Sequence, residues 1–258
     1  MVRKINLFVL YLLAISSAVW AQHIEFNKSA DLDQVYLKPH QSKGLVPMND
    51  LDMEFGYVLY QAEIDIPSDN AVLALENVRD YAVVFIDDQL TGTLTDQKKE
   101  LSLKLTSGKH NLKLYAENIG RITYGPEILD NSKGLFGSIT INNEEIENWT
   151  IIPLNIKAHE ISTVVFEPRK QVALPMFFKA EFELAQQSDF YLDISGWGMG
   201  EVWINNKYVG SFWEEEKQQS IQISADLVTK GKNEIVVFEM KNTQQKTMKI
   251  TDKPVFKK

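Results

Sequence analysis

The stretch Val84-Phe85-Ile86-Asp87-Asp88 recurs downstream as Val202-Trp203-Ile204-Asn205-Asn206. Each copy is an apolar run that ends in two Asp or Asn residues, which tolerate the positive φ of a tight hairpin turn. The match extends without a gap from residues 58–92 to residues 176–210. This internal repeat predicts two similar β-rich domains in tandem.

Strand-like alternation of apolar and polar residues continues outside the repeat. It is clearest in the runs 101–105, 111–115, 138–141 and 220–223. No segment after residue 21 has the long 3.6-residue apolar period of a helix. We therefore predict an all-β chain of two tandem jelly-roll β-sandwiches, in which the motif 196–200 (Gly-Trp-Gly-Met-Gly) is a close-packed strand entry.

The predicted organisation has four parts. Residues 1–21 read as an export signal, because Arg3-Lys4 precede a short apolar run and cleavage after Ala21 fits the small-residue rule. Residues 22–50 are a lead segment with room for one added strand, residues 51–158 the first sandwich and residues 159–258 the second. The apolar run is shorter than the roughly 20 residues of a spanning helix, so we expect a periplasmic or secreted chain without a membrane span.

Composition excludes several classes of function. The chain has 258 residues, with 35 acids against 27 bases and a formal net charge of −8. This balance argues against nucleic acid as a partner. The absence of cysteine removes disulfides, thiol nucleophiles and Cys-ligated metals.

No motif for catalysis or metal binding stands out. The four histidines have no metal-ligand spacing, and the acidic clusters at 52–54, 144–145 and 214–216 read as solvated turns. We expect no catalytic residue and no cofactor, while a structural calcium stays open because jelly rolls of this type often hold one.

Aromatic residues gather in the second half of the chain. Trp197, Trp213 and Tyr208 are the candidate carbohydrate-binding residues, because an exposed ring face can stack on a sugar. The alternative is that these rings belong to the core, as Trp203 does by its place in the strand alternation.

A series of motifs follows in a fixed order between residues 45 and 240: Phe55–Tyr60, Arg79–Asp87, Glu117–Gly125, Lys133–Gly137, Phe178–Phe182, Leu192–Gly200, Val202–Asn205 and Gly210–Trp213. In these motifs the chain resembles the C-terminal half of bacterial family-35 glycoside hydrolases, the β-galactosidases. The resemblance implies that both sandwiches are galactose-binding-like. In that family a TIM barrel with two catalytic glutamates comes before the sandwiches. Such a barrel takes about 250 residues, and here only residues 22–50 precede the first motif. No residue of this chain then corresponds to the catalytic pair.

Three functional hypotheses follow. The first is an exported, non-catalytic module that binds a galactose-containing carbohydrate or docks on a separate glycosidase chain. The second is a β-galactosidase-type hydrolase with a rebuilt or trans-completed site. The third is a structural remnant of a truncated β-galactosidase.

Overall fold

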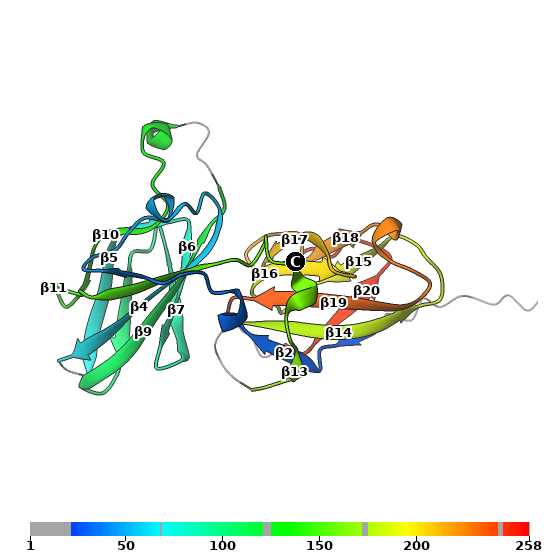
Figure 1. The fold of residues 1–258 in the computed structure, drawn as a ribbon, viewed down its shortest axis with the longest axis horizontal. Coiled ribbons are helices and arrows are strands. Elements are labelled where there is room, and N and C mark those ends of the chain that lie inside the picture. Colours follow the sequence, from blue (N-terminus) through cyan, green and yellow to red (C-terminus); the bar gives the residue numbers. More distant parts are fainter. Residues whose placement is uncertain (1–21, 68, 121–124, 172–174, 242–244, 258) are drawn as a thin grey trace, which may run out of the picture.

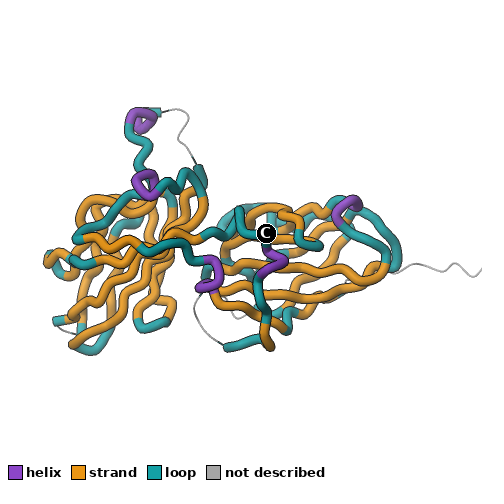
Figure 2. The backbone as a smooth tube through the Cα atoms, in the orientation of Figure 1, coloured by secondary structure: helices purple, strands orange, loops and turns teal. Residues whose placement is uncertain are grey.

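A computed structural model describes residues 22–67, 69–120, 125–171, 175–241 and 245–257. The predicted export signal lies outside the described residues. Within the described ranges strands dominate, and helix is confined to short 3-10 turns (Figure 2). These turns are η1 (Leu32–Val35), η2 (Met48–Leu51), η3 (Pro126–Leu129), η4 (Ile161–Thr163) and η5 (Ala225–Leu227).

Two antiparallel β-sandwiches lie side by side along the longest axis of the molecule (Figure 1). In the first sandwich the six-stranded sheet has the order β3 (His40–Ser42), β12 (Trp149–Leu154), β4 (Gly56–Ile66), β9 (Gly108–Asn118), β6 (Tyr81–Ile86) and β7 (Gln89–Thr95). Its four-stranded sheet has the order β11 (Glu144–Glu145), β10 (Gly134–Ile141), β5 (Asn70–Arg79) and β8 (Glu100–Lys104).

The second sandwich has the same plan. Its six-stranded sheet runs β13 (Glu167–Pro168), β2 (Lys28–Asp31), β14 (Met176–Leu184), β19 (Gly231–Glu239), β16 (Met199–Ile204) and β17 (Lys207–Trp213). Its four-stranded sheet runs β1 (His23–Glu25), β20 (Thr247–Thr251), β15 (Phe190–Asp193) and β18 (Ser220–Ile223). The predicted all-β fold of two tandem sandwiches is confirmed.

The repeated turn has the same geometry in both sandwiches. Asp87 and Asn205 have φ values of 48° and 49°. Each side-chain Oδ1 accepts a hydrogen bond at 2.9 Å from a backbone N–H on the neighbouring strand, that of Asn111 or Glu234. The predicted positive φ at these positions is confirmed. The side-chain acceptor fixes the hairpin to the sheet, which explains why only Asp and Asn occupy it.

The lead segment is divided between the two sandwiches. Its strands β1 and β2 join the second sandwich, and β3 joins the first. The sequence predicts at most one added strand in residues 22–50, and the structure has three short ones. The chain therefore crosses from the second sandwich to the first before the first repeat begins.

A separate apolar core fills each sandwich, and a third lies between the two six-stranded sheets. In this third core Phe85 and Tyr115 of the first sandwich share a cluster with Phe177, Trp203 and Phe238 of the second. Strands β6 and β16 are buried at every position because each is covered on both faces. This explains their unbroken apolar sequences.

The glycine motif at 196–200 is a close-packed strand entry, as predicted. A Cβ on Gly200 would lie 1.7 Å from the carbonyl oxygen of Phe238 on the paired strand. A Cβ on Gly198 would lie 2.7 Å from Oε1 of the buried Glu239, which accepts hydrogen bonds from the backbone of Gly198, Met199 and Lys241. Burial raises the pKa of Glu239 to about 7.

Candidate functional site

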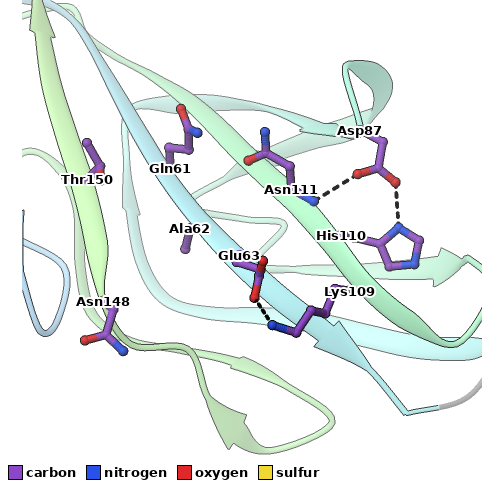
Figure 3. Close-up of a pocket in the computed structure, with 9 residues that line it drawn as sticks. All are labelled: Gln61, Ala62, Glu63, Asp87, Lys109, His110, Asn111, Asn148 and Thr150. Atoms are coloured by element: carbon purple, nitrogen blue, oxygen red, sulfur yellow. Dashed lines mark hydrogen bonds and ion pairs between the residues drawn. The ribbon is translucent and has the colours of Figure 1, made fainter.

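A polar hollow of about 440 Å³ opens on the first sandwich (Figure 3). It is lined by Gln61, Ala62, Glu63, Asp87, Lys109, His110, Asn111, Asn148 and Thr150. These residues come from strands β4, β9 and β12 and from the turn after β6, with Asn148 immediately before β12.

Strand alternation places the hollow next to the inter-sandwich core. Side chains at every second position of β4 share one sheet face, so Tyr57 and Leu59 of the inter-sandwich core are followed on that face by Gln61 and Glu63. Cross-strand pairing then puts Asn111 opposite Glu63. One sheet face thus changes from apolar, where the second sandwich covers it, to polar beyond that contact.

Two ion pairs hold the charged groups of the hollow. Lys109 Nζ donates to Glu63 Oε1 at 2.6 Å, and His110 Nδ1 lies 2.6 Å from Asp87 Oδ2. The other ring nitrogen of His110 lies 2.8 Å from the carbonyl oxygen of Thr106. Both ring nitrogens face acceptors, an arrangement that favours the doubly protonated imidazolium.

The direction of the two pKa shifts agrees with this arrangement. Hydrogen bonds to Asp87 and to the Thr106 carbonyl raise the pKa of His110 above its usual 6.5. Hydrogen bonds from the Asn111 backbone and from His110 lower the pKa of Asp87 below its usual 3.8. With His110 protonated, two cations balance two anions, and the hollow carries no net charge.

An Asp87→Asn variant should move the pKa of His110 down toward its usual value, because the largest favourable partner of the imidazolium loses its charge. Asn205 occupies the equivalent turn with nearly the same φ, so the hairpin should keep its shape. The imidazole proton shifts in an NMR titration measure this pKa. An unchanged titration in the variant would contradict the assigned ion pair.

The three aromatic residues predicted to bind carbohydrate lie elsewhere. Trp197 is fully buried between Phe26 and Phe178, with ring centroids 4.9 Å and 5.9 Å away. Its Nε1 donates to the Thr247 carbonyl at 3.0 Å. The expectation that it stacks on a sugar is therefore corrected: the glycine-rich motif around Trp197 packs the ring inward, and its faces are covered.

Trp213 and Tyr208 also have structural partners. Trp213 packs against the inter-sandwich core, edge-to-face with Tyr81 at 5.6 Å between centroids. Tyr208 is 45% exposed, and its hydroxyl donates to Glu201 Oε2 at 2.7 Å. Neither residue lines the polar hollow, and the three candidates do not converge on one site.

The residues of the polar hollow carry no strong sequence signal. Gln61, Glu63 and Asn111 occupy the outward positions of ordinary alternating strands. Only the register of three strands brings them together. The sequence marks Asp87 as a turn residue and gives His110 no partner; their ion pair depends on the sheet, because the two residues are 23 positions apart.

A second polar group, called here the interface cluster, lies between the sandwiches. It consists of Tyr57, Glu117, Lys157, Glu201 and Tyr208. The Tyr57 hydroxyl lies 2.9 Å from Glu117 Oε1 and 2.6 Å from Glu201 Oε1, and Lys157 Nζ lies 2.9 Å from Glu201 Oε1. Burial raises the pKa of Glu117 to about 7.

The interface cluster brings two glutamates together, but both are closed off from solvent. Glu117 is 3% exposed and Glu201 is fully buried. Among the described residues, no group of three or more His, Cys, Asp or Glu side chains is placed to hold a metal ion. No helix of the described chain has the length and apolarity that a membrane crossing requires.

Comparison with known proteins connects both sandwiches to one family. Residues 46–155 match the family model for the first all-beta domain of beta-galactosidase, and residues 175–233 match that for its galactose-binding domain. The resemblance read from the sequence motifs is confirmed: the chain is related to the all-beta and galactose-binding domains of β-galactosidases.

Full-length relatives are much longer than this chain. Beta-galactosidase 1 of Dictyostelium discoideum is 28% identical over 241 residues, which are 85% of this chain and 36% of that protein. Beta-galactosidase-1-like protein 2 of Homo sapiens is 27% identical over 207 residues, 78% of this chain and 32% of that protein. The chain thus spans about a third of the curated relatives it matches. Among solved structures, a Pleurotus ostreatus lectin in complex with GalNAc is 12% identical, with a TM-score of 0.29 over 89% of this chain and 80% of the lectin chain.

Proposed function

We propose that this chain is an exported, non-catalytic module that binds a neutral, galactose-containing carbohydrate in the polar hollow of its first sandwich. The observation that carries the proposal is the charge-balanced lining. Carboxylates accept from sugar hydroxyls, Lys109 and the His110 imidazolium donate to them, and the amides of Gln61 and Asn111 do both. Because the charges balance, the hollow offers no preference for an acidic sugar.

The same lining argues against hydrolysis in the hollow. Glycoside cleavage needs two carboxyl groups, one of them protonated at working pH. Here Glu63 and Asp87 are each bound to a cation, and the pKa of Asp87 is lowered. The lowered pKa of Asp87 keeps it from acting as the acid near neutral pH. Binding without turnover is the activity that these groups support.

We further propose that the module docks on a separately encoded glycosidase chain. Phe55 and Ile119 flank the paired ends of β4 and β9 and are 57% and 70% exposed. A smaller hollow of about 230 Å³, lined in part by Leu37, Met53 and Phe55, lies beside them. Exposed apolar side chains grouped at one end of a sandwich are typical of a protein contact.

The test is calorimetric titration of the chain from residue 22 onward with galactose and with β-galactan oligosaccharides. We expect saturable binding and no turnover of a chromogenic β-galactoside. Gln61→Ala and Asn111→Ala should each weaken binding about tenfold, the loss of roughly one net hydrogen bond to the sugar.

The matched control is Gln222→Ala, at an exposed strand position of the second sandwich, which should bind like the unaltered chain. Equal affinity in the control and both hollow variants would refute the site. Turnover by the purified chain would refute the non-catalytic assignment.

A further inference from the structure

Two buried glutamates from different sandwiches meet at a single tyrosine hydroxyl. Glu117 lies on β9 of the first sandwich and Glu201 on β16 of the second, and Tyr57 of β4 touches both. Glu117 Oε2 is buried and has no hydrogen-bond partner. This contact is the polar centre of an otherwise apolar inter-sandwich core.

The number of hydrogens available determines which of these three groups donates and which accepts. A tyrosine hydroxyl has one hydrogen and can donate to only one carboxylate. The shorter contact of the hydroxyl, 2.6 Å, is to the Glu201 oxygen that also lies 2.9 Å from the Lys157 ammonium, so Tyr57 donates its hydrogen to Glu201. The 2.9 Å contact between Tyr57 and Glu117 is then a hydrogen bond only if Glu117 carries a proton and donates it to the tyrosine oxygen.

We propose that a proton on Glu117 stabilises the contact between the two sandwiches beyond what their shared apolar core supplies, and that this contact loosens when the proton is lost. Without it, two carboxylates would compete for one hydroxyl hydrogen inside the interface. Among the described residues, Lys157 is the cation that acts on Glu117, and it is already paired with Glu201. The other titratable groups facing the cluster are Tyr208, bound to Glu201, and Asp80, bound to Lys133.

The expected direction of the pH effect follows from the raised pKa of Glu117. Its folded-state pKa is about 7 against an ordinary 4.5, with burial as the main cause, so the folded state holds the proton more tightly than the unfolded state. The stabilisation is complete below about pH 4.5 and is lost as pH rises through about 7.

The experiment compares the chain from residue 22 onward at pH 5 and pH 8. Small-angle scattering follows the separation of the sandwiches, and difference infrared spectroscopy follows the protonated carboxyl group. We expect the population of the open form to be about ten times larger, or more, at pH 8 than at pH 5. The infrared band of the protonated carboxyl group should disappear at pH 8. Glu117→Gln, whose amide donates to Tyr57 at every pH, should remain closed at pH 8.

Glu239→Gln is the matched control, because Glu239 is also buried with a pKa raised to about 7 but lies outside the interface cluster. This variant should keep the pH-dependent opening and the infrared band of Glu117. A full opening response in Glu117→Gln would overturn the proposal. If that variant does not fold, the absence of a protonated-carboxyl band at pH 5 in the Glu239→Gln chain would overturn it equally.

Discussion

Replacement of Gly200 with alanine is expected to unfold the second sandwich. The added Cβ would lie 1.7 Å from the backbone carbonyl oxygen of Phe238, on the strand paired with β16. Backbone atoms cannot rotate away as a side chain can, so β16 and β19 would have to separate. The free energy of unfolding should fall by more than about 4 kcal/mol, a loss typical of substitutions that disrupt a core. Urea unfolding followed by circular dichroism measures it.

Gly44→Ala is the control for this substitution. A Cβ at Gly44 meets no atom within 4 Å, and its φ lies outside the left-handed region. The change should raise the free energy of unfolding by less than about 1 kcal/mol, because alanine lowers the conformational entropy of the unfolded chain. Unfolding of the two variants at the same urea concentration would contradict the close contact between Gly200 and the Phe238 carbonyl.

Glu201→Ala should destabilise the chain by about 3–5 kcal/mol, the usual cost of breaking a buried charged network. Glu201 is fully buried and accepts from Tyr57, Tyr208 and Lys157. Its removal would take away the acceptor that these three donors share, and of the three, within the described residues, Tyr57 alone has a second hydrogen-bond contact, with Glu117. Chemical denaturation monitored by tryptophan fluorescence gives the free energy directly.

The matched comparison is Glu234→Ala on the neighbouring strand β19. Glu234 pairs with Lys179 at 2.9 Å, but its side chain is 41% exposed. Such a surface pair contributes less than about 1 kcal/mol. Similar losses in the two variants would mean that the network around Glu201 carries no special stability.

The fold could be predicted because its signals are local and occur twice. The pairs Asp87-Asp88 and Asn205-Asn206 mark turns by their chemistry, and the structure gives all four residues positive φ. The strands between them show the alternation that half-buried sheets require. Strands β6 and β16 lack alternation because a second sheet covers their outer faces, which the sequence reveals only as a longer apolar run.

The candidate site could not be predicted in the same way. The polar hollow depends on the register of β4 against β9 and β12, and register is a property of the assembled sheet. Aromatic composition pointed to Trp197, but exposure is decided by packing, and the ring lies inside the second sandwich. Glu117 and Glu201 are separated by 84 residues and meet only across two docked sheets.

The crossing of the lead segment decides which pieces of this chain can stand alone. Strand β1 pairs with β20 near the C-terminus, and β2 pairs with β14. The strands made first on the ribosome are thus among the last to find partners, after the whole first sandwich has emerged. A fragment that begins at residue 159 would lack one strand from each sheet of its sandwich, which leaves β14 and β20 with unpaired edges and β13 without a partner strand. The second sandwich is therefore one compact domain built from two separate stretches of sequence. Any exchange of this domain between proteins must carry residues 22–31 as well.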